Sequence, residues 1–210
     1  MTSNDLEQLI FDVAEALLVP VLILTLLALA AVIIESGAAL VELFRRRRRK
    51  FPELDTATNA ALKALNDGDH HAAETALVPY ASSRRMRTAI RALLGYAGDA
   101  SQTERAAKTL ADYDYASVKK LERTRVLVRA GPALGLMGTL IPLSPALAAL
   151  SNGDTAKLSE NLRIAFSVTV LGLLIGAVAF AISLIRDRLY GQDLSDLDYL
   201  ATTLVPEPPR

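Results

Sequence analysis

The chain has 210 residues, of which 51% are hydrophobic and only 5% aromatic, and its 23 basic and 23 acidic side chains cancel. A net charge of zero gives no general electrostatic attraction to nucleic acid, so we expect no nucleic-acid partner. The absence of cysteine excludes disulfides and thiolate metal sites. The apolar residues are gathered in three long blocks, which is typical of membrane-spanning helices.

The first block, residues 17–34, contains 18 residues without a charge. A bilayer core about 30 Å thick needs roughly 20 apolar residues in a helix, and the mostly apolar stretch 36–44 extends this helix past Glu35. A secretory signal peptide begins with basic residues. The segment before this block has only acidic charges: Asp5, Glu7, Asp12 and Glu15. We therefore predict a first transmembrane helix that is not a cleaved signal.

The basic run RRRRRK follows at residues 45–50. We interpret it as a stop-transfer signal that binds anionic lipid head groups, and a nucleic-acid patch is the alternative. The segment 45–129 holds 18 of the 23 basic residues, whereas the N-terminal segment before it holds none. The linker between the second and third blocks holds only Lys157 and Arg163. The positive-inside rule then places this segment and the C-terminus in the cytoplasm and the N-terminus outside.

The segment after the basic run has the pattern of short helices separated by turns. In ELDTATNAALKAL, Asp55 and Thr56 are candidate capping residues, and the turn NDGD follows. A second short helix is predicted near His70–Leu77. Its two adjacent histidines point to different faces and have no ligand partners at metal-site spacing, so no metal site is expected.

A third helix is predicted to begin after Ser82 or Ser83, either of which can cap it, and to end near Tyr96. From Ser101 the pattern is helical, with no breaker before Gly131. We expect one long helix that runs from this segment into the second apolar block.

The second block, residues 130–150, has 21 residues and is rich in small residues and prolines. Five of these are 4, 3, 4 and 3 positions apart and share one helical face: Gly131, Gly135, Gly138, Pro142 and Pro145. Small residues mark places where helix backbones approach closely in lipid. We predict that this face is a helix-packing interface.

The third block, residues 164–185, has 22 residues and a similar stripe. Its members are 4, 3, 4, 3 and 4 positions apart: Ala165, Thr169, Gly172, Gly176, Ala179 and Ser183. The first block is bulky and has no such stripe, so we expect it to face lipid while the other two pack together. Ordinary packing within one chain and a passage lined by both helices are each compatible with these stripes.

Thr139 and Thr169 lie in the middle of the second and third blocks. A threonine in a helix commonly donates to a carbonyl of its own helix, and the alternative interpretation is a set of hydroxyls lining a water-accessible passage. Neither block contains Asp, Glu, Lys or His, and proton relays through membranes normally need an ionisable group. We therefore expect that this chain alone has no side-chain proton relay.

The last predicted element is a C-terminal helix over SDLDYLATTL, in which Ser195 and Asp198 have the spacing of a capping box. The predicted organisation is all-α. It comprises an outer segment with transmembrane helix one (1–44), a cytoplasmic helical segment (45–129), transmembrane helix two (130–150), an outer loop (151–163), transmembrane helix three (164–185) and a cytoplasmic C-terminal helix and tail (186–210).

Two segments resemble the MotA/TolQ/ExbB family of ion-driven motor subunits: GPALGLMGTL at 131–140 and AFSVTVLGLLIGAVAF at 165–180. The three-span layout is closer to TolQ and ExbB than to four-span MotA. The resemblance implies a pentameric ring in the inner membrane of a prokaryote, in contact with membrane lipids. Helices two and three would line a pore around two copies of a single-span partner similar to MotB, TolR or ExbD. That partner would carry the ion-binding aspartate, so no cofactor is expected besides the transported H⁺ or Na⁺.

By the same resemblance Thr139 and Thr169 match the pore threonines of the family, and Ser144 offers a further hydroxyl. The chain departs from the family at Ile164, where TolQ and ExbB carry a glutamate, and at Pro142, which replaces a glycine. These differences indicate a divergent branch with altered pore chemistry.

The predicted function is that of a channel-forming subunit in an energy-transducing or stator complex driven by a proton or sodium gradient, and not that of an enzyme. The alternative is a non-conducting membrane scaffold that recruits partners through its cytoplasmic helices. A stand-alone transporter would need an ionisable substrate site or an inverted repeat, and the sequence has neither.

Overall fold

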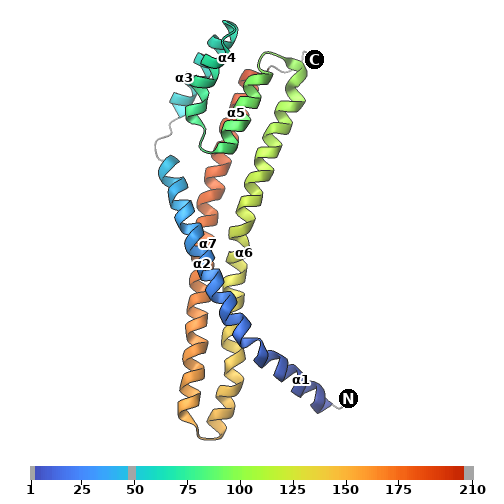
Figure 1. Ribbon diagram of the computed structural model, residues 1–210, viewed down its shortest axis with the longest axis vertical. Helices are drawn as coiled ribbons and strands as arrows, with labels where there is room; N and C mark the ends of the chain where they lie inside the picture. Colours follow the sequence, from blue (N-terminus) through green and yellow to red (C-terminus); the bar gives the residue numbers. More distant parts are fainter. Residues whose placement is uncertain (1–2, 47–50, 206–210) are drawn as a thin grey trace. The chain divides into compact units, whose positions relative to one another are not determined.

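The computed structural model describes residues 3–46 and 51–205, and all regular structure in this part of the chain is helical (Figure 1). In chain order the elements are α1 (Ser3–Ala16), α2 (Leu18–Arg46), α3 (Phe51–Asn66), α4 (His70–Leu77), the 3-10 turn η1 (Val78–Tyr80), α5 (Arg84–Tyr96), the 3-10 turn η2 (Ala100–Gln102), α6 (Thr103–Ser151) and α7 (Thr155–Leu204). The predicted all-α class is confirmed. Residues 47–50 of the basic run lie outside the described part of the chain.

The chain divides into two compact units. The apolar unit comprises Met1–Ala38 and Glu122–Leu184, and the polar unit comprises Ala39–Leu121 and Ile185–Arg210. Three helices contribute residues to both units, namely α2, α6 and α7. The division follows the sequence pattern, because all three apolar blocks belong to the apolar unit except for their last residue, Ile185.

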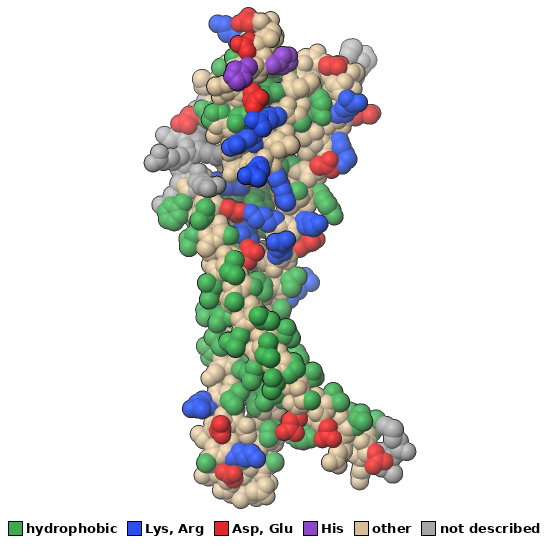
Figure 2. Space-filling model, viewed as in Figure 1, with side chains coloured by type: hydrophobic (Ala, Val, Ile, Leu, Met, Phe, Trp, Pro, Cys, Tyr) green, Lys and Arg blue, Asp and Glu red, His purple; other side chains and the backbone are tan. Residues whose placement is uncertain are grey.

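Three helical stretches are long and apolar enough to cross a membrane: Asn4–Phe44, Ala100–Ser151 and Thr155–Leu204. Large hydrophobic side chains such as Ile34, Leu136 and Leu173 are exposed on them. Figure 2 shows many hydrophobic side chains along the middle stretch of the molecule, with almost no charged ones among them. Contact between such a surface and water is unfavourable, whereas lipid accommodates it. The prediction of three helices that are long and apolar enough to cross a membrane is confirmed.

In the apolar unit α6 and α7 run side by side and are joined by a short turn at residues 152–154 (Figure 1). Gly153 in this turn has a φ of 72°, which glycine adopts without steric cost. The Asp154 side chain accepts a hydrogen bond from the Lys157 backbone N–H at 2.9 Å and so caps α7. The outer loop predicted over residues 151–163 is therefore wrong in its extent, because this cap lets α7 begin at Thr155.

The core of the polar unit is built from α3, α4, α5, the first part of α6 and the last part of α7. Its fully buried hydrophobic members include Ala61, Leu77, Ile90, Leu93, Leu197 and Leu200. Burying a leucine or isoleucine side chain contributes about 1.5–3 kcal/mol. The two long helices are thus tied to the short ones by apolar packing inside this unit.

The three short helices largely match their predicted bounds. α4 has the predicted bounds, and Ser83 caps α5 by accepting a hydrogen bond from the Met86 backbone N–H at 3.1 Å. α3 differs, because it begins at Phe51 and not near Asp55. A proline at its second position needs no N–H partner in the first turn. Asp55 instead accepts a hydrogen bond from the Tyr199 hydroxyl at 2.5 Å.

Both long helices are continuous. α6 runs from Thr103 to Ser151, which confirms the predicted passage of one helix into the second apolar block. The separate C-terminal helix predicted at Ser195 is wrong, because α7 continues unbroken to Leu204. No proline interrupts it before residue 206, and the leucines of its last turns are anchored in the core.

The cap of α4 provides a testable prediction. The Asp69 side chain accepts a hydrogen bond from the Ala72 backbone N–H at 2.9 Å. Asp69→Ala removes this cap and is expected to lower the free energy of unfolding by about 1 kcal/mol. Thermal unfolding of the purified chain in detergent measures the change. Asp67→Ala, in the same turn and exposed, is the control, and an equal loss in both variants would contradict the capping role.

Candidate functional site

Glycines bring α6 and α7 into backbone contact in the apolar unit. A Cβ atom placed at Gly172 would lie 2.5 Å from the carbonyl oxygen of Gly131 and 2.7 Å from the Cα atom of Gly135. A Cβ atom at Gly176 would lie 2.8 Å from Cδ of Pro132. Real Cβ atoms do not approach other atoms this closely, so these positions accept only glycine. The two small-residue stripes of the sequence therefore face each other within one chain.

Two other predicted interface residues on α6, Gly138 and Pro142, are also buried. A Cβ atom at Gly138 would collide with the side chain of Val168 on α7. This geometry is that of packing within a single chain, the simpler of the two interpretations that the spacing allowed. A passage lined by α6 and α7 would then involve residues at the edges of this contact.

Thr139 and Thr169 converge on one backbone carbonyl at the edge of the contact. The Thr139 hydroxyl lies 2.8 Å from the carbonyl oxygen of Leu136 and 3.1 Å from that of Gly135. The Thr169 hydroxyl lies 3.0 Å from the carbonyl oxygen of Ala165 and 3.3 Å from that of Gly135. Each hydroxyl thus has a helix carbonyl for its proton, while its oxygen keeps lone pairs that can accept a hydrogen bond.

Ser144 lies apart from the two threonines. It is exposed on α6, and five positions along a helix rotate a side chain by about 140° from Thr139. Three prolines stand inside the same helix without ending it: Pro132, Pro142 and Pro145. The structure brings Thr139 and Thr169 together and leaves Ser144 on another side of α6.

The polar unit contains a buried charge cluster that the sequence analysis missed. Asp193 is 1% exposed, and its carboxylate accepts hydrogen bonds from the Arg46 guanidinium at 2.8 Å, the Ser82 hydroxyl at 2.6 Å and the Tyr113 hydroxyl at 2.7 Å. Burial and the neighbouring carboxylate raise the pKa of Tyr113, so its phenol stays protonated and donates. These bonds join α2, α6, α7 and the residues that precede α5.

A second polar group involves the same three long helices. Lys120 forms an ion pair with Glu42, and the Tyr190 hydroxyl donates to the same carboxylate at 3.3 Å. The Arg186 Nε atom lies 3.4 Å from it, and the Arg46 guanidinium lies 5.5 Å from the centre of the Tyr190 ring. The Arg186 side chain is 1% exposed, whereas those of Glu42 and Lys120 are 21% and 40% exposed. A buried charge such as Arg186 is tolerated where an opposite charge lies close to it.

Part of this cluster could have been predicted from the helical spacing of its residues in the sequence. Arg186, Tyr190 and Asp193 follow one another at 4 and 3 positions, and Glu42 and Arg46 are 4 positions apart, so each set shares one face of its helix. In the sequence, the basic residues of this cluster are among those that orient the chain by the positive-inside rule. Their acidic partners lie far away along the chain, and local spacing does not reveal which pairs meet.

The helices and their contact show to which class of protein the chain belongs. Three apolar helices long enough to cross a membrane, two of them in backbone contact without a charged side chain at that contact, make this a multi-pass membrane protein. A family model for the MotA/TolQ/ExbB proton channel family matches residues 79–195. This is more than half of the chain, and it includes α5, α6 and most of α7. The chain belongs to the MotA/TolQ/ExbB proton channel family, as the resemblance of its two glycine-containing segments indicated.

No curated protein and no solved structure matches the chain. The family assignment therefore stands on the matched segment and on the two motifs within it.

Proposed function

We propose that the chain is the channel-forming subunit of a complex that a proton or sodium gradient drives. Membership in a proton channel family supports an ion-channel role in energy transduction. The observation that carries the proposal is the absence of any charged side chain in the sequence segments 130–150 and 164–185. Proton pathways through membranes normally use an ionisable group. In this proposal, therefore, the acid is supplied by another polypeptide.

In the proposed assembly five copies form a ring in the inner membrane of a prokaryote, with the N-terminus outside and the C-terminus in the cytoplasm. Two copies of a single-span partner, each with a membrane-embedded aspartate, occupy the centre. The distribution of Lys and Arg supports the orientation. The bulky exposed face of α2, with Ile33 and Ile34 at 62% and 72% exposure, supports a lipid-facing place for that helix.

Thr139 and Thr169 are the mid-span polar side chains of this proposal. Each hydroxyl has a helix carbonyl to donate to, which leaves its oxygen free to accept. Such an oxygen can accept a hydrogen bond from the protonated aspartate of the partner, or it can coordinate Na⁺ in place of water. Ser144, exposed on another side of α6, offers a further hydroxyl.

The proposed function is tested by purifying the chain together with a single-span protein encoded beside its gene. We expect five copies of the chain and two of the partner by native mass spectrometry, and gradient-driven ion flux in liposomes. An Asp→Asn change in the partner span should abolish the flux. A stable complex without any flux would favour the non-conducting scaffold instead.

Thr169→Val tests the role of the hydroxyl within that complex. The change keeps the side-chain volume and removes one oxygen, so the oligomer should assemble normally on a native gel. Ion flux is expected to fall about tenfold, the effect of losing roughly one hydrogen bond in the transition state for ion transfer. Thr169→Ser retains the hydroxyl and is the control. Equal flux in Thr169→Val and the unmodified protein would contradict a pore role for this residue.

A further inference from the structure

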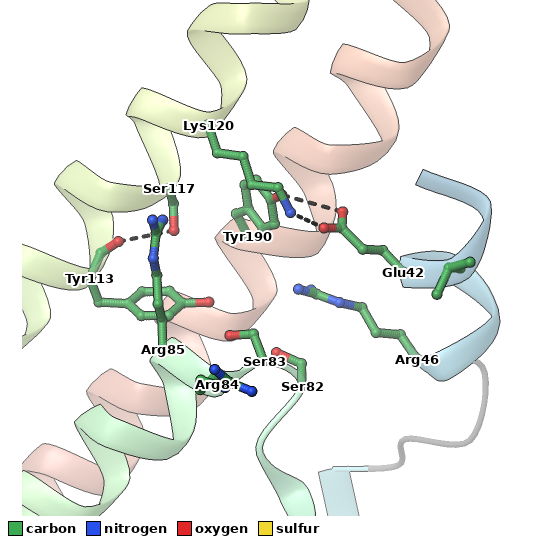
Figure 3. Close-up of a pocket in the computed structure, with 11 residues that line it drawn as sticks. Glu42, Arg46, Ser82, Ser83, Arg84, Arg85, Tyr113, Ser117, Lys120 and Tyr190 are labelled. Atoms are coloured by element: carbon green, nitrogen blue, oxygen red, sulfur yellow. Dashed lines mark hydrogen bonds and ion pairs between the residues drawn. The ribbon is translucent and has the colours of Figure 1, made fainter. Parts of the chain in front are cut away.

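The polar unit contains a cavity of about 350 Å³ that the proposed function does not use (Figure 3). Residues of α2, α5, α6 and α7 line it, together with the two serines that precede α5, and all of them belong to the polar unit. Its volume lies at the lower end of the range for small-molecule sites in proteins.

The lining of this cavity is strongly basic. Four cationic side chains line it, Arg46, Arg84, Arg85 and Lys120, while Glu42 is the one carboxylate among the described residues that do so. Two of the cations have acidic partners, because Arg46 pairs with Asp193 and Lys120 pairs with Glu42. The two arginines at the start of α5 are exposed and form a surplus of positive charge, which attracts an anion to the cavity.

Both arginines line the cavity, and one of them is held by a hydrogen bond to the main chain. Arg85 donates from Nη1 to the carbonyl oxygen of Ala116 at 2.9 Å, which fixes the direction of its guanidinium. Figure 3 shows the Arg84 guanidinium beside Ser82 and Ser83, and the Arg85 side chain extending toward Ser117. Planar guanidinium groups match the oxygen geometry of phosphate, and nearby serine hydroxyls supply further donors.

Two lining residues lie shortly after the apolar segments of their own helices. Tyr190 is five residues past Ile185, about 7.5 Å along α7, and Arg46 is two residues past Phe44, about 3 Å along α2. Head groups occupy a layer of roughly 5–8 Å outside each face of the hydrocarbon core. A lipid phosphate is therefore within the depth range of these two residues.

We infer that this cavity binds a phosphate group, supplied either by an anionic lipid head group or by a soluble phosphate. Arg84 and Arg85 carry the recognition, and the paired residues Arg46 and Lys120 form the wall behind them. The site is independent of the ion pathway proposed above, since none of its residues lies in the segments 130–150 or 164–185.

The test compares two double variants of the full chain, each of which removes two arginines. The cavity variant, Arg84→Gln with Arg85→Gln, removes the two surplus positive charges from the lining of the cavity. Arg87→Gln with Arg105→Gln removes two exposed arginines that do not line it and is the matched control. Delipidated protein in an uncharged detergent is titrated calorimetrically with dihexanoylphosphatidylglycerol, with inorganic phosphate, and with zwitterionic dihexanoylphosphatidylcholine.

We expect the cavity variant to bind about 25-fold more weakly than the unmodified chain, or about fivefold for each arginine, and the control to stay within twofold. Arg84→Lys with Arg85→Lys keeps the charge but loses the planar guanidinium groups, so its affinity should lie between those of the unmodified chain and the cavity variant. If circular dichroism shows that the cavity variant does not fold, the single variant Arg84→Gln, at an exposed position, replaces it in the test. Its affinity is expected to be about fivefold lower than that of the unmodified chain.

The probes distinguish the two sources of the phosphate. Binding of phosphatidylglycerol without binding of inorganic phosphate assigns a lipid head group, and comparable binding of inorganic phosphate assigns a soluble ligand. The inference is overturned if neither anionic probe binds, if phosphatidylcholine binds as tightly as phosphatidylglycerol, or if the control variant loses as much affinity as the cavity variant.

Discussion

Asp193→Ala is expected to lower the free energy of unfolding by about 3–5 kcal/mol, the usual loss when one partner of a buried ion pair is removed. The change leaves the Arg46 guanidinium, whose side chain is 8% exposed, without its carboxylate. It also removes the acceptor for the hydroxyls of Ser82 and Tyr113. Three polar side chains from different parts of the chain are linked through this one carboxylate, so no single neighbour can replace it.

Unfolding of the purified chain in detergent, followed by far-ultraviolet circular dichroism, measures this effect. Asp198→Ala is the matched control, because Asp198 lies on the same helix, is exposed and is expected to change stability by less than about 0.5 kcal/mol. Asp193→Asn keeps one oxygen acceptor and should fall between the two. A loss under about 1 kcal/mol for Asp193→Ala would show that the cluster does not hold the unit together.

Gly172→Ala is expected to weaken the α6–α7 contact by about 1–3 kcal/mol or more, although it adds only one methyl group. The new Cβ atom would meet backbone atoms of Gly131 and Gly135 at 2.5–2.8 Å. Backbone atoms inside a helix cannot move aside as a flexible side chain can, so the two helices must separate. The unfolding midpoint in detergent and the oligomer band on a native gel report the result.

Gly191→Ala is the control on the same helix, because a Cβ atom there meets nothing within 4 Å. Replacing a helical glycine with alanine in open space is expected to stabilise the helix by up to about 1 kcal/mol. The two alanine variants should therefore change stability in opposite directions. Gly135→Ala should change stability only slightly, because a Cβ atom there would have its nearest contacts at 3.4 Å. Gly135→Leu, with a much larger side chain, should disrupt assembly. The same response at Gly172 and Gly191 would contradict the close packing.

Most of the fold could be predicted because its signals are local. The charge-free blocks indicate three spanning helices, and the serines at 82 and 83 indicate the start of α5, which Ser83 caps. The bounds that were wrong depend on contacts from elsewhere in the chain. Asp55 resembles a cap in the sequence but bonds Tyr199, and the apparent start at Ser195 is overridden by the core packing of the last turns of α7.

The candidate sites were predictable to different degrees. The spacing of the glycines indicates a packing face, but spacing alone does not show that the partner of Gly131 is Gly172 in the same chain. The cluster around Asp193 was not predicted, since its members come from positions 46, 82, 113 and 193. Electrostatic pairing across such separations depends on the tertiary structure, and the sequence pattern shows only that the charges exist.

The prolines inside α6 alter how apolar this helix is. A proline nitrogen carries no hydrogen, so the carbonyl four residues earlier loses its usual donor. In α6 the affected oxygens belong to Val128, Gly138 and Ile141. These oxygens lie in or beside the uncharged segment 130–150, in which Thr139 and Ser144 carry the side-chain hydroxyls. Any cation or donor that reaches this helix encounters electronegative main-chain atoms that a hydropathy profile does not register.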